Sequence, residues 1–181
     1  MSKREYQAYL QGALHDGTRS DLHNTHRISQ KGIGWLSQLS SLLAEMGHKS
    51  WMYREGKTRE VYVLETTAHF LDTDYDPDLL VTDAERIAYV RGYFDAEGGL
   101  PRSPEARLYI QFTQKDRSEL EQVKTILESM GIECGEVHTP SAEVDPDYWR
   151  FYVRAKSHMA FAGLIGSWHP RKDAILRRMK R

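Results

Sequence analysis

The sequence contains a single cysteine, Cys134. This excludes an internal disulfide and any cysteine-based zinc finger, and we expect Cys134 to be a small packed residue. No apolar run is long enough to span a bilayer, and the N-terminal stretch MSKREYQAYL lacks the apolar region of a signal peptide. We therefore expect an intracellular protein, cytoplasmic or organellar and not secreted, with no membrane partner.

The chain also has almost no net charge, with a formal value of −1 over 181 residues. That total hides an uneven distribution, because residues 72–85 contain six acids and no Lys or Arg, which leaves +5 on the rest of the chain. The C-terminal stretch HPRKDAILRRMKR is strongly basic. Such asymmetry favours a nucleic-acid partner, although a solvated acidic linker and a solvated basic helix would give the same totals.

An internal repeat organises the sequence. RISQKGIGWLSQLSSLLAEMG (27–47) runs parallel to QFTQKDRSELEQVKTILESMG (111–131), EVYV (60–63) matches RFYV (150–153), and AYLQGALHDG (8–17) matches AYVRGYFDAEG (88–98). The matches keep the same order along the chain, which favours a true repeat over chance. We predict a first repeat at 1–71, an acidic linker at 72–85 and a second repeat at 86–181.

Each copy has the pattern of helix, strands, helix, strands. In the second copy a capping box of Thr82 and Glu85 starts a helix that runs to Glu97, and ARLYIQFTQ (106–114) alternates as a strand does. A helix ending at Gly131, a strand YWRFYV, a helix SHMAFAGLIGSW and a last helix starting at Pro170 follow. We predict an α+β fold of two tandem αββαββα-type repeats related by a pseudo-two-fold axis, with helices on one side of antiparallel sheets that form a saddle.

Two acids stand where a helix disfavours them. In YVRGYFDAEGG (89–99), Asp95 and Glu97 lie in the last helical turn, where an anion typically costs a few tenths to 1 kcal/mol against the helix dipole. Asp16 in GALHDG occupies the matching helix end of the first copy. Small residues would let these two helices cross closely and bring Asp16 and Glu97 together; they are Gly12, Ala13 and Gly92.

Paired carboxylates repel one another unless a cation lies between them. Carboxylate oxygen is the ligand that Mg²⁺ prefers, and phosphate oxygens often complete its shell. The acids therefore favour a divalent-metal site that faces a phosphodiester.

The motif residues resemble a known family. VRGYFDAEG (90–98) resembles the LAGLIDADG signature of homing endonucleases, and LQGALHDG (10–17) resembles a degenerate copy that is one residue shorter. TQK (113–115) and SQK (29–31) also match the family pattern after the first long strand. The resemblance covers nearly the whole chain, since monomeric members carry two copies. It implies a monomer, free-standing or intron-encoded, that cuts both strands of a double-stranded DNA target with Mg²⁺ or another divalent cation such as Mn²⁺.

The resemblance also implies roles for individual residues. Asp16 and Glu97 would be catalytic metal ligands, with His15 as the alternative in the first copy. The internal repeat itself, which places no acid opposite Asp95, favours a helix-end or interface contact for that residue. Gln30 and Gln114 would orient solvent, and Lys172, or else Arg171, would stabilise charge at the scissile phosphate. By strand parity, the residues that would face DNA are His23, Thr25, Arg27, Ser29, Arg107, Tyr109, Gln111 and Thr113.

Other interpretations remain open. The same fold could serve an RNA-intron maturase, with intron RNA as partner, or a DNA-binding protein without catalysis, which the degenerate first motif favours. A homodimer that uses one copy per chain is disfavoured by the internal repeat.

Overall fold

The computed structural model describes residues 1–103 and 105–179. The chain divides into two compact units, Met1–Ala96 with Trp168–Pro170, and Glu97–Ser167 with Arg171–Arg181. The predicted repeat boundaries concern sequence similarity and stay a prediction. In the structure, the first helix of the second copy belongs to the first unit as far as Ala96. No helix in the described part of the chain is long and apolar enough to cross a membrane.

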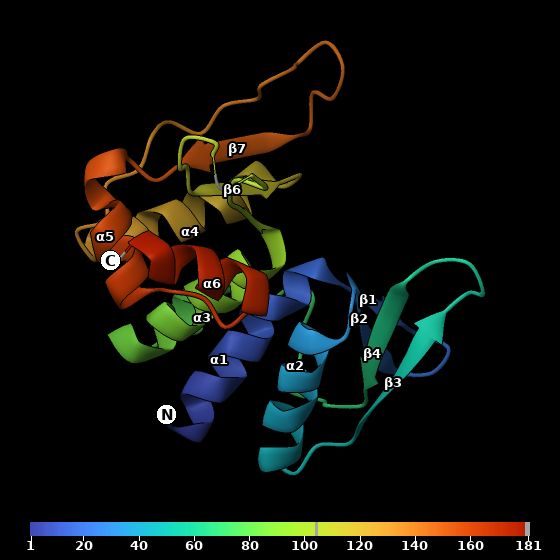
Figure 1. The fold of residues 1–181 in the computed structure, drawn as a ribbon. Helices are drawn as coiled ribbons and strands as arrows, with labels where there is room; N and C mark the ends of the chain where they lie inside the picture. The colour runs from blue at the N-terminus through green and yellow to red at the C-terminus, as the bar shows by residue number, and fades with distance from the viewer. Residues whose placement is uncertain (104, 180–181) are drawn as a thin grey trace. The chain divides into compact units, whose positions relative to one another are not determined.

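The first unit is built on a four-stranded antiparallel sheet in the order β1-β2-β4-β3. One helix, α2, runs alongside this sheet in Figure 1 and buries Trp35, Leu36, Leu39 and Leu43. The elements follow the predicted order: α1 (Lys3–Ala13), the 3-10 turn η1 (Leu14–Asp16), β1 (Gly17–Ser20), β2 (Thr25–Lys31), α2 (Gly34–Glu45), β3 (Ser50–Glu55) and β4 (Val61–Thr66).

The strand register separates the two faces of this sheet. Ile28 pairs with Leu64, and both are buried on the face that α2 covers. Arg27 pairs with Glu65 on the opposite face, since side chains alternate along a strand. The prediction that helices cover one side of the antiparallel sheet is confirmed here.

Helices α1 and α3 (Asp83–Glu97) meet through glycines. A Cβ added to Gly12 would lie 2.7 Å from the Tyr93 nitrogen and closer still to the Tyr89 carbonyl oxygen. A Cβ added to Gly92 would lie 2.9 Å from the Ala13 nitrogen. The two backbones therefore approach more closely than any residue with a side chain would allow.

The start of α3 is capped as predicted. The Glu85 amide donates to Thr82 Oγ1 at 3.2 Å, and the Thr82 amide donates to Glu85 Oε2 at 3.4 Å. These bonds satisfy backbone donors that the first helical turn leaves unpaired.

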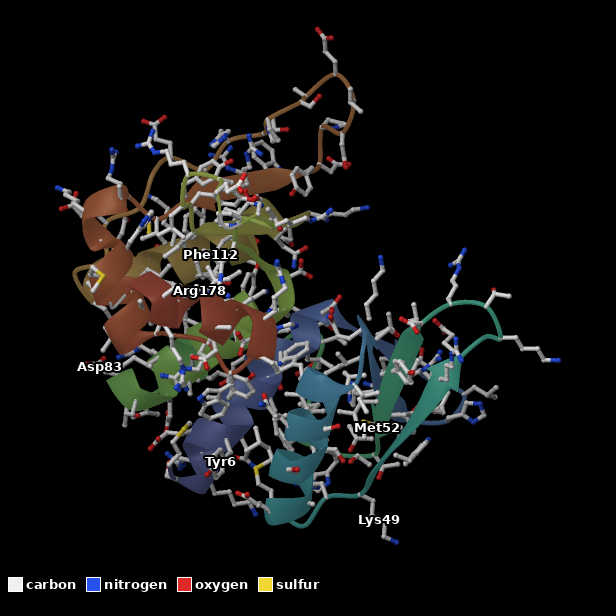
Figure 2. All side chains as sticks on the ribbon, in the orientation of Figure 1. Tyr6, Lys49, Met52, Asp83, Phe112 and Arg178 are labelled. Atoms are coloured by element: carbon white, nitrogen blue, oxygen red, sulfur yellow. The ribbon has the colours of Figure 1, made fainter. Side chains whose placement is uncertain are left out.

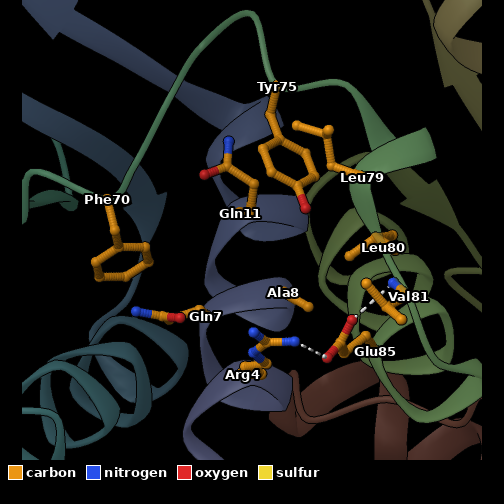
Figure 3. A pocket seen from close by; sticks show the side chains of 10 residues that line it. All are labelled: Arg4, Gln7, Ala8, Gln11, Phe70, Tyr75, Leu79, Leu80, Val81 and Glu85. Carbon is orange, nitrogen blue, oxygen red and sulfur yellow. Dashed lines mark hydrogen bonds and ion pairs between the residues drawn. The ribbon is translucent and has the colours of Figure 1, made fainter.

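The acidic linker is anchored to α1, while five of its six acids are exposed to solvent. The Gln11 side chain donates to the Asp72 carbonyl oxygen and accepts from the Asp72 amide at 3.1 Å. Farther along, the linker carries the short turn η2 (Pro77–Leu79) and lies over α1 around a pocket of about 280 Å³ (Figure 3). Its lining side chains are Arg4, Gln7, Ala8, Gln11, Phe70, Tyr75, Leu79, Leu80, Val81 and Glu85.

The second unit has a three-stranded antiparallel sheet in the order β5-β6-β7. Its interior contains Phe112, which is labelled in Figure 2. Phe112 stacks on Phe151 at 5.0 Å between ring centroids and meets Phe161 edge-on at 5.9 Å. The elements are β5 (Gly98–Gly99), β6 (Gln111–Gln114), α4 (Arg117–Ser129), β7 (Trp149–Tyr152), the 3-10 turn η3 (Ala155–Ser157), α5 (His158–Leu164) and α6 (Pro170–Met179).

Three predicted elements of this unit differ from the structure. The strand expected over 106–114 begins only at Gln111, because its neighbour β5 is two residues long and offers few backbone partners. The strand that the αββαββα pattern places before YWRFYV is reduced to bridges from Cys134 and His138, and proline-containing chain follows. The helix expected over 157–168 ends at Leu164, since Gly166 takes a left-handed φ of 62°.

Candidate active site

The first motif ends in a tighter turn than the second. Helix α1 stops at Ala13, and Leu14–Asp16 form a 3-10 turn, which fits a motif that is one residue shorter. The Nε2 of Gln30, on β2, donates to Oδ2 of Asp16, which is partly exposed. The β1–β2 pairing brings these residues together from positions 14 apart. The carboxylate of the first copy is therefore held in a fixed orientation.

The second motif ends in a regular helix whose last residue is Glu97. Thr113 Oγ1 donates to the Glu97 carbonyl oxygen at 3.0 Å, which ties the end of α3 to β6. The Gln114 side-chain oxygen accepts from the Lys115 amide at 2.7 Å. Gln30 thus donates to the Asp16 carboxylate, whereas the side-chain oxygen of Gln114 accepts from the amide of the next residue, Lys115.

Asp95, the other acid of the second motif, is an internal anchor. It is 1% exposed, and its Oδ2 accepts from the Tyr9 hydroxyl at 2.7 Å and from the amides of Trp168 at 2.9 Å and His169 at 3.2 Å. The Trp35 Nε1 donates to the Tyr9 oxygen at 2.9 Å. Burial and the nearby Asp95 charge raise the pKa of Tyr9 well above its usual value. The predicted contact role of Asp95 is confirmed.

His15 lies among tyrosines of α3. Its Nε2 is 2.8 Å from the Tyr89 hydroxyl oxygen, and its ring centroid is 4.4 Å from that of Tyr93. This packing favours Asp16 over His15 as the candidate metal ligand of the first copy. In α6, Lys172 is 5% exposed and Arg171 is exposed. The burial of Lys172 makes Arg171 the more accessible of the two candidate cations.

Of the four residues predicted to face DNA from the first copy, two lie on the open face of the sheet and are accessible to solvent. Arg27 and Ser29 are on the face away from α2, and both are at least partly exposed. Thr25 shares that face but is 2% exposed. The strand-parity prediction is wrong for His23, because residues 21–24 form a turn in which Asn24 has a φ of 49°.

Sequence reasoning missed Trp51 and Tyr53 of β3. They are 43% and 37% exposed, and their pairing with Glu65 and Val63 puts them on the same face as Arg27. The Arg27 guanidinium lies 6.0 Å from the Tyr53 ring centroid. The alternating run SWMYRE was the available signal, since a half-exposed edge strand carries aromatic residues at every second position.

The second sheet presents a similar face. Gln111 and Thr113 are on the side opposite the buried Phe112, and the register adds Arg150 and Tyr152 of β7. The Arg150 guanidinium lies 5.2 Å from the Tyr152 ring centroid. Arg107 and Tyr109 precede β6 and line one pocket with Tyr152.

The donor chemistry of the motif acids fits a hard divalent cation. Within residues 1–103 and 105–179, no group of three or more His, Cys, Asp or Glu side chains is placed to hold a metal ion. Asp16 nevertheless offers a carboxylate that a side-chain amide orients at a partly exposed turn. Oxygen donors of this kind suit Mg²⁺ and Ca²⁺, which keep waters and accept phosphate oxygens as further ligands.

Comparison with known proteins agrees with this architecture. Residues 84–166 match the family described as a LAGLIDADG-like domain. No curated protein sequence is significantly similar to the chain. Many solved structures match the fold, among them I-DmoI in complex with DNA and Ca, with a TM-score of 0.71 and 18% identity over 98% of this chain and 100% of that one.

A second group of structures shares the fold. The N-terminal LAGLIDADG domain of DUF199/WhiA matches with a TM-score of 0.70 and 17% identity, over 92% of this chain and 84% of that one. Full-length DUF199/WhiA from Thermatoga maritima matches with a TM-score of 0.71 and 15% identity, over 99% of this chain and 62% of that one. The chain therefore has the LAGLIDADG fold, which is mixed α+β with antiparallel sheets.

Proposed function

We propose that the protein is a site-specific double-strand DNA endonuclease of the homing type that hydrolyses phosphodiesters with a divalent cation. The observation that carries the proposal is the Gln30 to Asp16 hydrogen bond, because it orients a carboxylate at the end of a LAGLIDADG-like motif. Related folds support it: the homing endonuclease I-DmoI has been solved with DNA and Mn, and a variant of it with its target DNA in the presence of Mg.

Asp16 and Glu97 would hold the metal, one carboxylate from each copy of the motif. Bound Mg²⁺ or Mn²⁺ would act as a Lewis acid that stabilises charge developing on the scissile phosphate. Gln30 would keep Asp16 in one rotamer through its amide bond. An exposed cation at the start of α6, Arg171 for accessibility, would neutralise phosphate charge.

The polar faces of the two sheets would contact the duplex. Ribbons of antiparallel strands fit the major groove, where side chains reach base edges while Lys and Arg contact phosphates. In the first sheet Arg27, Ser29, Lys31, Trp51 and Tyr53 lie on this face and are partly or fully exposed. The mixture of cations and hydroxyls gives both kinds of contact.

Cleavage of a randomised duplex library in Mg²⁺ tests the proposal, with Ca²⁺ as the condition for measuring binding without turnover. The wild type is expected to cut a small set of sequences on both strands. Glu97→Gln should abolish cutting and leave binding in Ca²⁺ within about threefold, since a nearly isosteric change at a partly exposed helix end alters little else. Glu45→Gln is the matched control, because Glu45 is also the last residue of a helix.

The outcomes separate the alternatives. Selective duplex binding without cutting in Mg²⁺ would identify a DNA-binding protein without catalysis. Preference for structured RNA over every duplex would identify a maturase. Loss of binding together with cutting in Glu97→Gln would assign Glu97 a structural role. Gel filtration of the protein alone and on a selected duplex would test the expected monomer.

A further inference from the structure

A buried carboxylate lies within the sheet face that would carry the base contacts. Glu65 of β4 is 8% exposed and stands opposite Arg27 on β2 and Trp51 on β3. An acid on a DNA-facing surface would ordinarily weaken binding, because it repels phosphate. Its burial beside two hydroxyl groups and the Arg27 cation calls for a role other than direct contact with DNA.

Two hydroxyl groups donate their protons to this carboxylate. Thr25 Oγ1 donates to Glu65 Oε1 at 2.5 Å, and the Tyr53 hydroxyl donates to Oε2 at 3.0 Å. The Thr25 bond, with that of Tyr53, lowers the pKa of Glu65, although burial opposes them. An ionised carboxylate accepts and cannot donate, so each hydroxyl proton is committed to it.

The consequence for DNA differs between the two hydroxyls. Thr25 is 2% exposed and is therefore shielded, whereas Tyr53 is 37% exposed. With its proton directed at Glu65, the Tyr53 oxygen can only accept a further hydrogen bond. The Arg27 guanidinium packs near the Tyr53 ring and lies 3.5 Å from Glu55, which helps to hold the ring in place.

Base edges in the major groove differ in what they offer to such an oxygen. Adenine presents its N6 amino group and cytosine its N4 amino group, both donors, whereas guanine O6 and thymine O4 are acceptors. An oxygen that can act only as an acceptor therefore bonds to the amino group of adenine or cytosine, and it repels guanine O6 and thymine O4.

Resting on the proposed function, we infer that Glu65 is a positioning residue that makes Tyr53 an acceptor-only contact and so selects adenine or cytosine at one position of the DNA target. Glu65 acts through Tyr53 and does not touch the base. The same device explains why a buried acid is kept on a surface that binds a polyanion.

Selection from a randomised duplex library in Ca²⁺, followed by sequencing of bound DNA, tests this inference on the full chain. The wild type should prefer adenine or cytosine at one position by about tenfold, the size of a single good base contact. Tyr53→Phe should reduce that preference to within about twofold and leave the other positions unchanged. Tyr62→Phe is the matched control, because Tyr62 is also in the sheet but one residue out of phase, on the opposite face.

Glu65→Gln gives a sharper result. Its amide keeps an oxygen for the shorter Thr25 bond and turns its NH₂ group towards Tyr53, which frees the Tyr53 proton. The preference at that one position should then move towards guanine or thymine. A merely structural role for Glu65 would weaken binding to all sequences without changing the base selected.

The failures can be told apart. A wild type that selects no duplex sequence would overturn the proposed function and the inference with it. A selective wild type whose base profile is unchanged in both Tyr53→Phe and Glu65→Gln would overturn the inference alone. Tyr53→Phe removes only a partly exposed hydroxyl, so its profile decides the matter even where Glu65→Gln unfolds.

Discussion

Because α1 and α3 are in close contact, we predict that alanine at either helix-crossing glycine destabilises the fold, although helix propensity alone would predict stabilisation. Replacing glycine by alanine inside a helix ordinarily stabilises it by about 0.5–1 kcal/mol. At Gly12 the added Cβ would lie 2.7 Å from the Tyr93 nitrogen, and at Gly92 it would lie 2.9 Å from the Ala13 nitrogen. These neighbours are backbone atoms, so no side chain can rotate away and the two helices must separate.

The size of the effect follows from two opposing contributions. Overpacking typically costs about 1–3 kcal/mol, and the upper end applies here because the clash is with backbone on both helices. Subtracting the propensity gain leaves a destabilisation of about 2 kcal/mol for Gly12→Ala, and the same for Gly92→Ala. For a chain of this size that corresponds to a Tm lower by about 4–8 °C.

Thermal and urea unfolding, followed by circular dichroism, would measure these changes. Gly163→Ala in α5 is the matched control, because a Cβ there meets nothing within 4 Å. It should raise the Tm by about 1–4 °C through propensity alone. Gly12→Ala or Gly92→Ala with a Tm equal to or above that of the wild type would refute the close approach of α1 and α3.

Three further predictions concern buried charge and the motif amides. Asp95→Asn should destabilise the fold by about 2 kcal/mol in urea unfolding, because three donors lose a charged acceptor; wild-type stability would contradict the anchor role. Stability should fall as the pH drops below about 6.5, because burial lowers the pKa of His26 and the unfolded chain therefore takes up the proton more readily. It should fall again below about 4.5, because hydrogen bonds lower the pKa of Glu65 in the folded state and the unfolded chain is protonated first. Unfolding curves measured across this pH range would test both effects, and His26→Gln should flatten the first fall. Gln30→Ala should slow cutting of one strand by about tenfold, and Gln114→Ala less, because Gln30 donates to Asp16 whereas the side-chain oxygen of Gln114 accepts from the Lys115 amide. Equal effects in a strand-specific cleavage assay would count against this asymmetry.

The sequence was most informative where a repeat and a local rule agreed. The glycines, the capping box and the polar alternation of the strands each have a physical cause that acts within a few residues, and all three predict the observed geometry. The internal contact role of Asp95 was also predictable, since only Glu97 has an acidic counterpart in the first copy.

The rest depends on contacts far apart in the chain. Nothing near Lys172 in the sequence indicates that it is 5% exposed, because its burial comes from packing of the whole helix. The short β6 reflects the two-residue length of its partner, and the turn at His23 moves that residue out of strand phase. Glu65 gives no sequence signal, since its hydrogen-bond donors lie 40 and 12 residues away.

The Asp95 anchor also sets an order of events during synthesis. The first unit includes Trp168–Pro170, whose amides satisfy a carboxylate from α3 and whose indole packs 4.3 Å from the Tyr9 ring. A ribosome adding about 5–20 residues per second makes the remaining elements of this unit well before that segment appears. The N-terminal half therefore waits on the ribosome with two of the three hydrogen bonds described for Asp95 still unmade, and it gains them only after Trp168–Pro170 has been synthesised.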